Sequence, residues 1–103
     1  MERDTSYTHT SDHHRDTVHE KVILEHLKDE LSGVVDYCEL HEKHEHSNPA
    51  VAEQFAEMAR DEFSHAYMLK QSLCHLKLWH EVPQDILESW EKVCTLMGFS
   101  TNL

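Results

Sequence analysis

The sequence is poor in helix breakers and in the residues that favour strands. It has two glycines and two prolines in 103 residues, and aromatic residues make up 8 %. Helix formers dominate and strand signals are weak, so we expect an all-helical protein. Hydrophobic residues are 39 % of the chain, which is thin for a self-sufficient core of this length. Burial through oligomerisation is therefore expected.

Long apolar segments are also missing. No apolar run approaches the ~20 residues that a membrane span needs. The polar N-terminus lacks the apolar segment of a signal peptide and reads MERDTSYTHTSDHHRD over residues 1–16. We expect residues 1–16 to be flexible, and the protein to be cytoplasmic without membrane contact.

Positive charge is scarce. Nine Lys and Arg stand against 20 Asp and Glu, and the formal net charge is −11. A nucleic-acid partner needs a cationic surface and is not expected, whereas strong acidity suits the attraction of cations. The 11 histidines form either a solvated polar surface or metal sites.

Cysteine occurs only at three distant positions, Cys38, Cys74 and Cys94. No CxxC pair occurs, so neither a zinc knuckle nor a rubredoxin-type iron site is supported. An odd number without an export signal predicts reduced, buried thiols.

Two short breaks divide what remains into three predicted helices. The first runs from about residue 17 to 46 and the second from 49 to about 79. Asn48 suits the N-cap and Pro49 the first position of the second helix. Pro83 opens the third helix.

The third helix is short and amphipathic, and Gly98 is its expected stop. Its apolar residues recur at helical spacing: Ile86, Leu87, Trp90, Val93, Cys94 and Met97. We therefore predict one helical domain over residues 17–98, followed by a tail over 99–103.

Each long helix carries an apolar seam that one glutamate interrupts. The first seam reads Ile23, Leu27, Glu30, Val34, Tyr37, His41 and His44. The second reads Phe55, Ala59, Glu62, Ala66, Leu69, Leu73 and Leu76. His65 lies one turn beyond Glu62 on the same face. Gly33, inside the first helix, is tolerated at a cost of about 1 kcal/mol.

The two glutamates are expected to meet if the helices form an antiparallel hairpin. With the turn at about residues 46–47, Glu30 and Glu62 each lie roughly 24 Å from it, at ~1.5 Å per residue. Glu30, Glu62 and His65 should therefore converge at one level.

A divalent cation would compensate two adjacent carboxylates that face a core. Oxygen ligands with one imidazole suit iron or manganese, and less exclusively zinc. Four-helix di-iron proteins use a Glu from each of two helices and Glu-x-x-His from each of the other two. This chain has half of that set, so two copies would complete it.

The segments DELSGVVDY, SNPAV and ARDEFSHAYM resemble the encapsulated ferritins over about residues 20–80. These are small half-ferritins related to the ferritin and rubrerythrin superfamily. The resemblance implies a ferritin-like antiparallel two-helix hairpin with a short C-terminal helix. Such a protomer dimerises into a four-helix bundle, and several dimers can form a ring such as a decamer.

The resemblance also implies a ferroxidase with a di-iron centre between two chains, for iron storage or detoxification. Glu30, Glu62 and His65 would be the metal ligands, with Tyr37 close to the metal in the catalytic site. Manganese or zinc could replace iron. An encapsulin shell is the implied partner and location, although the tail MGFSTNL does not look like the family's docking peptide.

Two other functions stay open. One is a metal-binding or sensor module without turnover, and the other is a helical oligomer whose glutamates are ordinary polar positions. Tyr37 can be a core aromatic that hydrogen-bonds a ligand. The histidines of LHEKHEH (His41, His44 and His46) are either a solvated helix end or an accessory group for metal uptake.

Overall fold

The structure is a computed structural model that describes the backbone of residues 8–99 and the side chains of residues 19–99. Its elements are the helices α1 (Thr8–His44), α2 (Pro49–His75) and α3 (Gln84–Met97), with a 3-10 turn, η2 (Trp79–Glu81), before α3. The predicted all-α fold is confirmed, since the described residues contain no strand.

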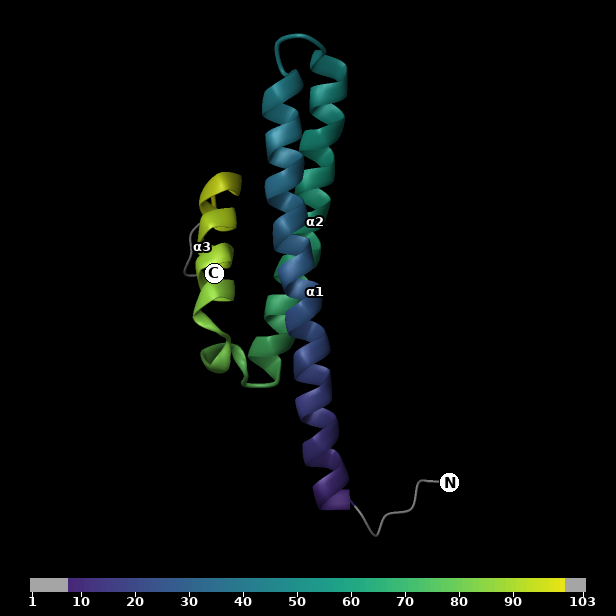
Figure 1. Cartoon of the computed structure of the whole chain (residues 1–103), viewed down its shortest axis with the longest axis vertical. Helices are drawn as coiled ribbons and strands as arrows, with labels where there is room; N and C mark the ends of the chain where they lie inside the picture. The colour runs from purple at the N-terminus through teal and green to yellow at the C-terminus, as the bar shows by residue number, and fades with distance from the viewer. Residues whose placement is uncertain (1–7, 100–103) are drawn as a thin grey trace, which may run out of the picture.

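Helices α1 and α2 form the predicted antiparallel hairpin (Figure 1). The side chain of Asn48 caps α2 by accepting from the Val51 N–H at 3.4 Å, and Pro49 occupies the first turn, as predicted. The N–H of Asn48 donates to the carbonyl of His44 at 2.8 Å, which closes the turn. These bonds fix the level at which residues of the two helices face each other.

Helix α1 begins earlier than predicted, at Thr8 instead of about residue 17. Its N-terminal part continues beyond the far end of α2 (Figure 1). The segment expected to be flexible, residues 1–16, is thus helical from Thr8 onward. Residues 1–7 lie outside the described residues, and their flexibility stays a prediction.

Helix α2 ends at His75, four residues before the predicted end at Trp79. The N–H of Leu78 donates to the carbonyl of Leu73 at 2.8 Å, and Lys77 takes a left-handed conformation with φ of 61°. This is a Schellman motif, which usually has glycine at the left-handed position. Lysine accepts the conformation at a cost of about 1–2 kcal/mol, and Leu78 packs against the core.

Helix α3 folds back along the hairpin and covers one side of it (Figure 1). Trp90 is its anchor: it is 2 % exposed and stacks on Phe63 with ring centroids 5.8 Å apart. Gly98 ends α3 in the left-handed conformation, as predicted, and directs Phe99 onto Phe63 at 5.0 Å. Phe99 therefore belongs to the packed structure and not to a loose tail.

The core lies between α3 and the hairpin. Its buried side chains include Leu27, Leu31, Val34, Phe63, Leu73, Ile86, Trp90, Val93 and Cys94. Cysteine burial was predicted for all three positions, but only Cys94 is buried; Cys38 is half-buried and Cys74 is exposed. Among the described residues, no helix combines the length and apolarity that a membrane span requires.

Candidate metal centre

Glu30 of α1 and Glu62 and His65 of α2 come together on the hairpin. Each offers one ligand atom, and these three atoms all lie within 4.8 Å of one another. Nδ1 of His65 lies 3.4 Å from Oε1 of Glu30 and 4.0 Å from Oε2 of Glu62. Within the described part of the chain, no other group of three His, Cys, Asp or Glu side chains is placed this way. The structure thus agrees with the prediction that these three residues lie at the same distance from the hairpin turn.

The cluster is half-buried and opens to solvent through the histidine. The side chains of Glu30 and Glu62 are 23 % and 29 % exposed, whereas that of His65 is 55 % exposed. The sequence predicted a seam that faces a core. In the single chain this face is open, because the hollow beside the cluster is lined by residues of α1 and α2 and by none of α3.

The two carboxylates make the site electrostatically unfavourable when it holds no cation. Burial raises the pKa of Glu62, and hydrogen bonding and Coulomb repulsion from Glu30 raise it further, while His65 opposes the shift. Oε1 of Glu30 is buried and has no hydrogen-bond partner. A buried carboxylate oxygen without a donor is costly, and a bound cation would satisfy it.

Gly33 provides the space in which the Glu62 carboxylate lies. A Cβ atom at this position would collide with Oε1 of Glu62 and would lie 3.2 Å from its Cδ. From the sequence, Gly33 was predicted only to be tolerated inside the helix. The sequence feature that could have indicated this role is the position of Gly33 inside a long helix, three residues after Glu30.

The donor set fits a transition-metal ion. Zinc, for example, lies about 2.0–2.2 Å from carboxylate oxygen or imidazole nitrogen, so two ligand atoms can be at most about 4.4 Å apart. The two histidine–glutamate distances satisfy this limit, and the 4.8 Å bound on the group requires only small side-chain rotations. Two carboxylates and one imidazole suit iron, manganese or zinc.

The other residues singled out by the sequence lie outside this cluster. Tyr37 is two turns from Glu30 and stacks on Phe55 with ring centroids 6.3 Å apart; its proximity to a metal stays a prediction. Nδ1 of His41 donates to the carbonyl of Ala52 at 2.9 Å, and Nδ1 of His44 to that of Leu40 at 2.8 Å. Their role in metal uptake also stays a prediction.

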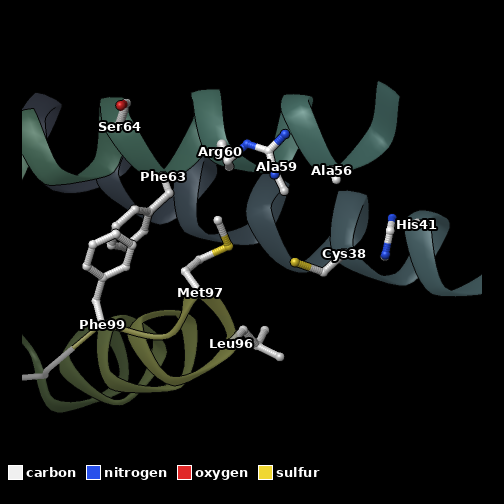
Figure 2. Close-up of a pocket in the computed structure, with 10 residues that line it drawn as sticks. All are labelled: Cys38, His41, Ala56, Ala59, Arg60, Phe63, Ser64, Leu96, Met97 and Phe99. Carbon is white, nitrogen blue, oxygen red and sulfur yellow. The ribbon is translucent and has the colours of Figure 1, made fainter. Parts of the chain in front are cut away.

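A larger cavity of about 540 Å³ lies between the hairpin and the C-terminal end of α3 (Figure 2). Cys38, Met97 and Phe99 are among its lining residues, which include no carboxylate. Burial, followed by repulsion from Glu42, raises the pKa of the Cys38 thiol. The cavity therefore lacks the hard oxygen donors of the carboxylate cluster.

Comparison with models of protein families places this chain. The family model described as Rubrerythrin matches residues 21–99, a range that contains the hairpin residues of the cluster and all of α3. No curated protein and no solved structure matches the chain.

Proposed function

Because this chain belongs to the rubrerythrin family, we propose that it is a ferroxidase that oxidises Fe(II) to Fe(III) for iron storage or detoxification. The observation that carries the proposal is the convergence of Glu30, Glu62 and His65 around a buried carboxylate oxygen that accepts no hydrogen bond. Within the family, the sequence segments quoted above favour the encapsulated ferritins. An encapsulin shell remains part of the proposal for that reason.

The proposed site is shared by two chains. One chain supplies two glutamates and one histidine, which is half of the ligand set of a four-helix di-iron centre. A second copy, placed across the open face, would add the other half and cover the half-exposed ligands. Tyr37 would then lie near the edge of the joint site.

Each residue has a defined role toward the substrate, Fe(II). The carboxylates of Glu30 and Glu62 bind it as hard oxygen donors, and His65 binds it through nitrogen. Since the pKa of Glu62 is raised, this carboxyl must release any bound proton when the cation binds. Each Fe(II) gives one electron to O₂ or peroxide, and Fe(III) leaves for storage.

Oxidation of Fe(II) by variants tests the proposal. Fe(II) is added without oxygen, O₂ is then admitted, and the rise in Fe(III) absorbance is followed. We expect His65→Ala and Glu62→Ala each to lower the rate at least about tenfold, because each removes a ligand. The matched control is Glu57→Ala, an exposed glutamate of α2, which should oxidise Fe(II) as wild type does.

The apo proteins provide the check on folding. Removing a carboxylate that repels its neighbour should leave the unfolding free energy unchanged or raise it. Wild-type oxidation rates in His65→Ala would contradict the assigned site. Loss of apo stability in Glu62→Ala with normal iron binding would indicate a structural role for this residue.

A second function, metal binding without turnover, is supported by one feature. The three ligand atoms come from a single chain, so a cation can be held without a partner. In that case wild type would bind Fe(II) at the cluster, but the rate of oxidation by O₂ would equal that of Fe(II) in protein-free buffer.

A further inference from the structure

His26 lies beside the carboxylate cluster and was not singled out by the sequence. It precedes Glu30 by four residues on α1, so the two side chains share one face of the helix. Both line a hollow of about 210 Å³ together with His65, Met68 and Leu69. The hollow is thus the solvent side of the candidate metal centre, and His26 forms part of its wall.

The Glu30 side chain leans toward the helical turn that carries His26. Side chains on a helix point toward its N-terminus, so the Glu30 carboxylate extends back over the turn that carries His26. Oε1 of Glu30 has no hydrogen-bond partner, and His26 is exposed and makes no hydrogen bond or ion pair with the described residues. Its imidazole can therefore rotate into the hollow without breaking an existing interaction.

Within one chain, the cluster has one donor fewer than a closed zinc site takes. Two carboxylates and one imidazole make three protein ligands, whereas zinc in closed sites takes four. Imidazole in the fourth position would favour zinc, iron, cobalt or nickel over manganese, magnesium or calcium, which prefer oxygen.

We propose that His26 is a fourth protein ligand to the divalent cation held by Glu30, Glu62 and His65, and that it biases the site toward nitrogen-preferring metals. This inference rests on the proposed metal-binding function. It adds a second imidazole from the same chain and assigns to it the choice of metal.

Calorimetric titration of the apo protein with Zn²⁺ and with Mn²⁺ tests the inference without using activity. We expect His26→Gln to weaken Zn²⁺ binding at least about tenfold and Mn²⁺ binding less than about threefold. The control is His19→Gln, an exposed histidine of the same helix, which should leave both affinities unchanged. An equal loss for both metals would overturn the role of His26 in metal choice.

Nuclear magnetic resonance of ¹⁵N-labelled histidine gives a direct readout on the wild-type chain. The imidazole signal of His26, assigned by its absence in His26→Gln, should shift on Zn²⁺ binding in the same stoichiometric range as that of His65. Shifts of the His65 signal alone would overturn the inference, whether or not the variant folds normally.

The same experiments separate this inference from the proposed function. If His65→Ala loses Zn²⁺ binding while His26→Gln retains it, only the fourth ligand is wrong. If wild type binds neither metal, the proposed metal-binding function fails as well.

Discussion

The Glu62 carboxylate occupies the space that a Cβ atom would fill at Gly33. Glycine inside a helix costs about 0.5–1 kcal/mol relative to alanine, and α1 carries this cost next to its half-buried glutamate. In return, the Glu62 carboxylate lies against the backbone of α1, close to Glu30. The position of a metal ligand therefore depends on a residue without a side chain.

Gly33→Ala should separate helix stability from metal affinity. We expect the apo protein to gain up to about 1 kcal/mol in free energy of unfolding, from the higher helix propensity of alanine. Zn²⁺ affinity should fall at least about tenfold, because the added methyl group displaces Oε1 of Glu62. Thermal unfolding of the apo protein and calorimetric Zn²⁺ titration measure the two effects.

Ser32→Ala is the control for this change, since Ser32 is exposed and adjacent on the same helix. It should also favour the helix while leaving the Zn²⁺ affinity as in wild type. A Gly33→Ala protein with wild-type Zn²⁺ affinity would show that Glu62 does not need the space that glycine leaves.

Helix α3 is held to the hairpin by a cluster of aromatic side chains around Trp90. Its ring stacks on Phe63 and on Tyr67, with centroids 5.8 and 6.5 Å away, and meets the edge of Trp79 at 5.8 Å. The ammonium of the buried Lys70 lies 5.1 Å from the Trp79 ring and 5.7 Å from that of Trp90. Cation–π attraction thus stabilises the corner where α2, η2 and α3 meet.

Trp90→Ala should destabilise the protein by about 3–5 kcal/mol, because it leaves a large cavity in the core. The milder Trp90→Phe keeps a ring stacked on Phe63, but the smaller ring loses much of the contact with Trp79 and Lys70. Hydrogen exchange should show α3 losing protection before α1 and α2 in both variants.

Leu96→Ala is the matched control on α3, because Leu96 is half-exposed and lies outside the aromatic cluster. Its effect on stability should be within about 0.5 kcal/mol, as for most surface substitutions. Uniform loss of protection over all three helices in Trp90→Phe would contradict the view that Trp90 acts mainly as the anchor of α3.

The whole molecule has one closed and one open side. Helix α3 covers the side that contains the core, while the hollow beside the metal ligands is lined by residues of α1 and α2 alone. Met68 in this hollow is 61 % exposed, and Leu69 also lines it. Apolar side chains around half-buried carboxylates are the surface expected where a second copy would complete a four-helix bundle.

Metal should favour association of two chains. The formal charge of −11 on each chain opposes dimerisation, and a cation between the carboxylates lowers this repulsion. Ligands that only the associated state supplies shift the equilibrium toward it. Sedimentation velocity at low protein concentration should therefore show wild type moving from monomer to dimer, or to a larger ring, when Zn²⁺ is added.

Glu62→Ala should not respond to Zn²⁺ in this experiment, while Glu57→Ala should behave as wild type. A wild-type chain that binds Zn²⁺ at full stoichiometry and stays monomeric would exclude the shared site. The single-chain metal site would then be the better description.

The helices, the hairpin and the meeting of Glu30, Glu62 and His65 could all be predicted from the amino-acid sequence. Helix limits at Asn48, Pro49 and Gly98 depend on backbone preferences of a few neighbouring residues, which a sequence displays directly. The convergence of Glu30, Glu62 and His65 followed from equal distances to one turn, because a helix has a fixed rise per residue.

The surroundings of these three residues could not be predicted in this way, because they depend on tertiary packing. The end of α2 at Lys77 depends on the packing of Leu78, the role of Gly33 on its contact with Glu62, and the inclusion of His26 on the shape of the hollow. The side of the hairpin that α3 covers likewise decides how far the metal ligands are exposed. All of these features depend on how packed helices are rotated about their axes, which local sequence preferences do not specify.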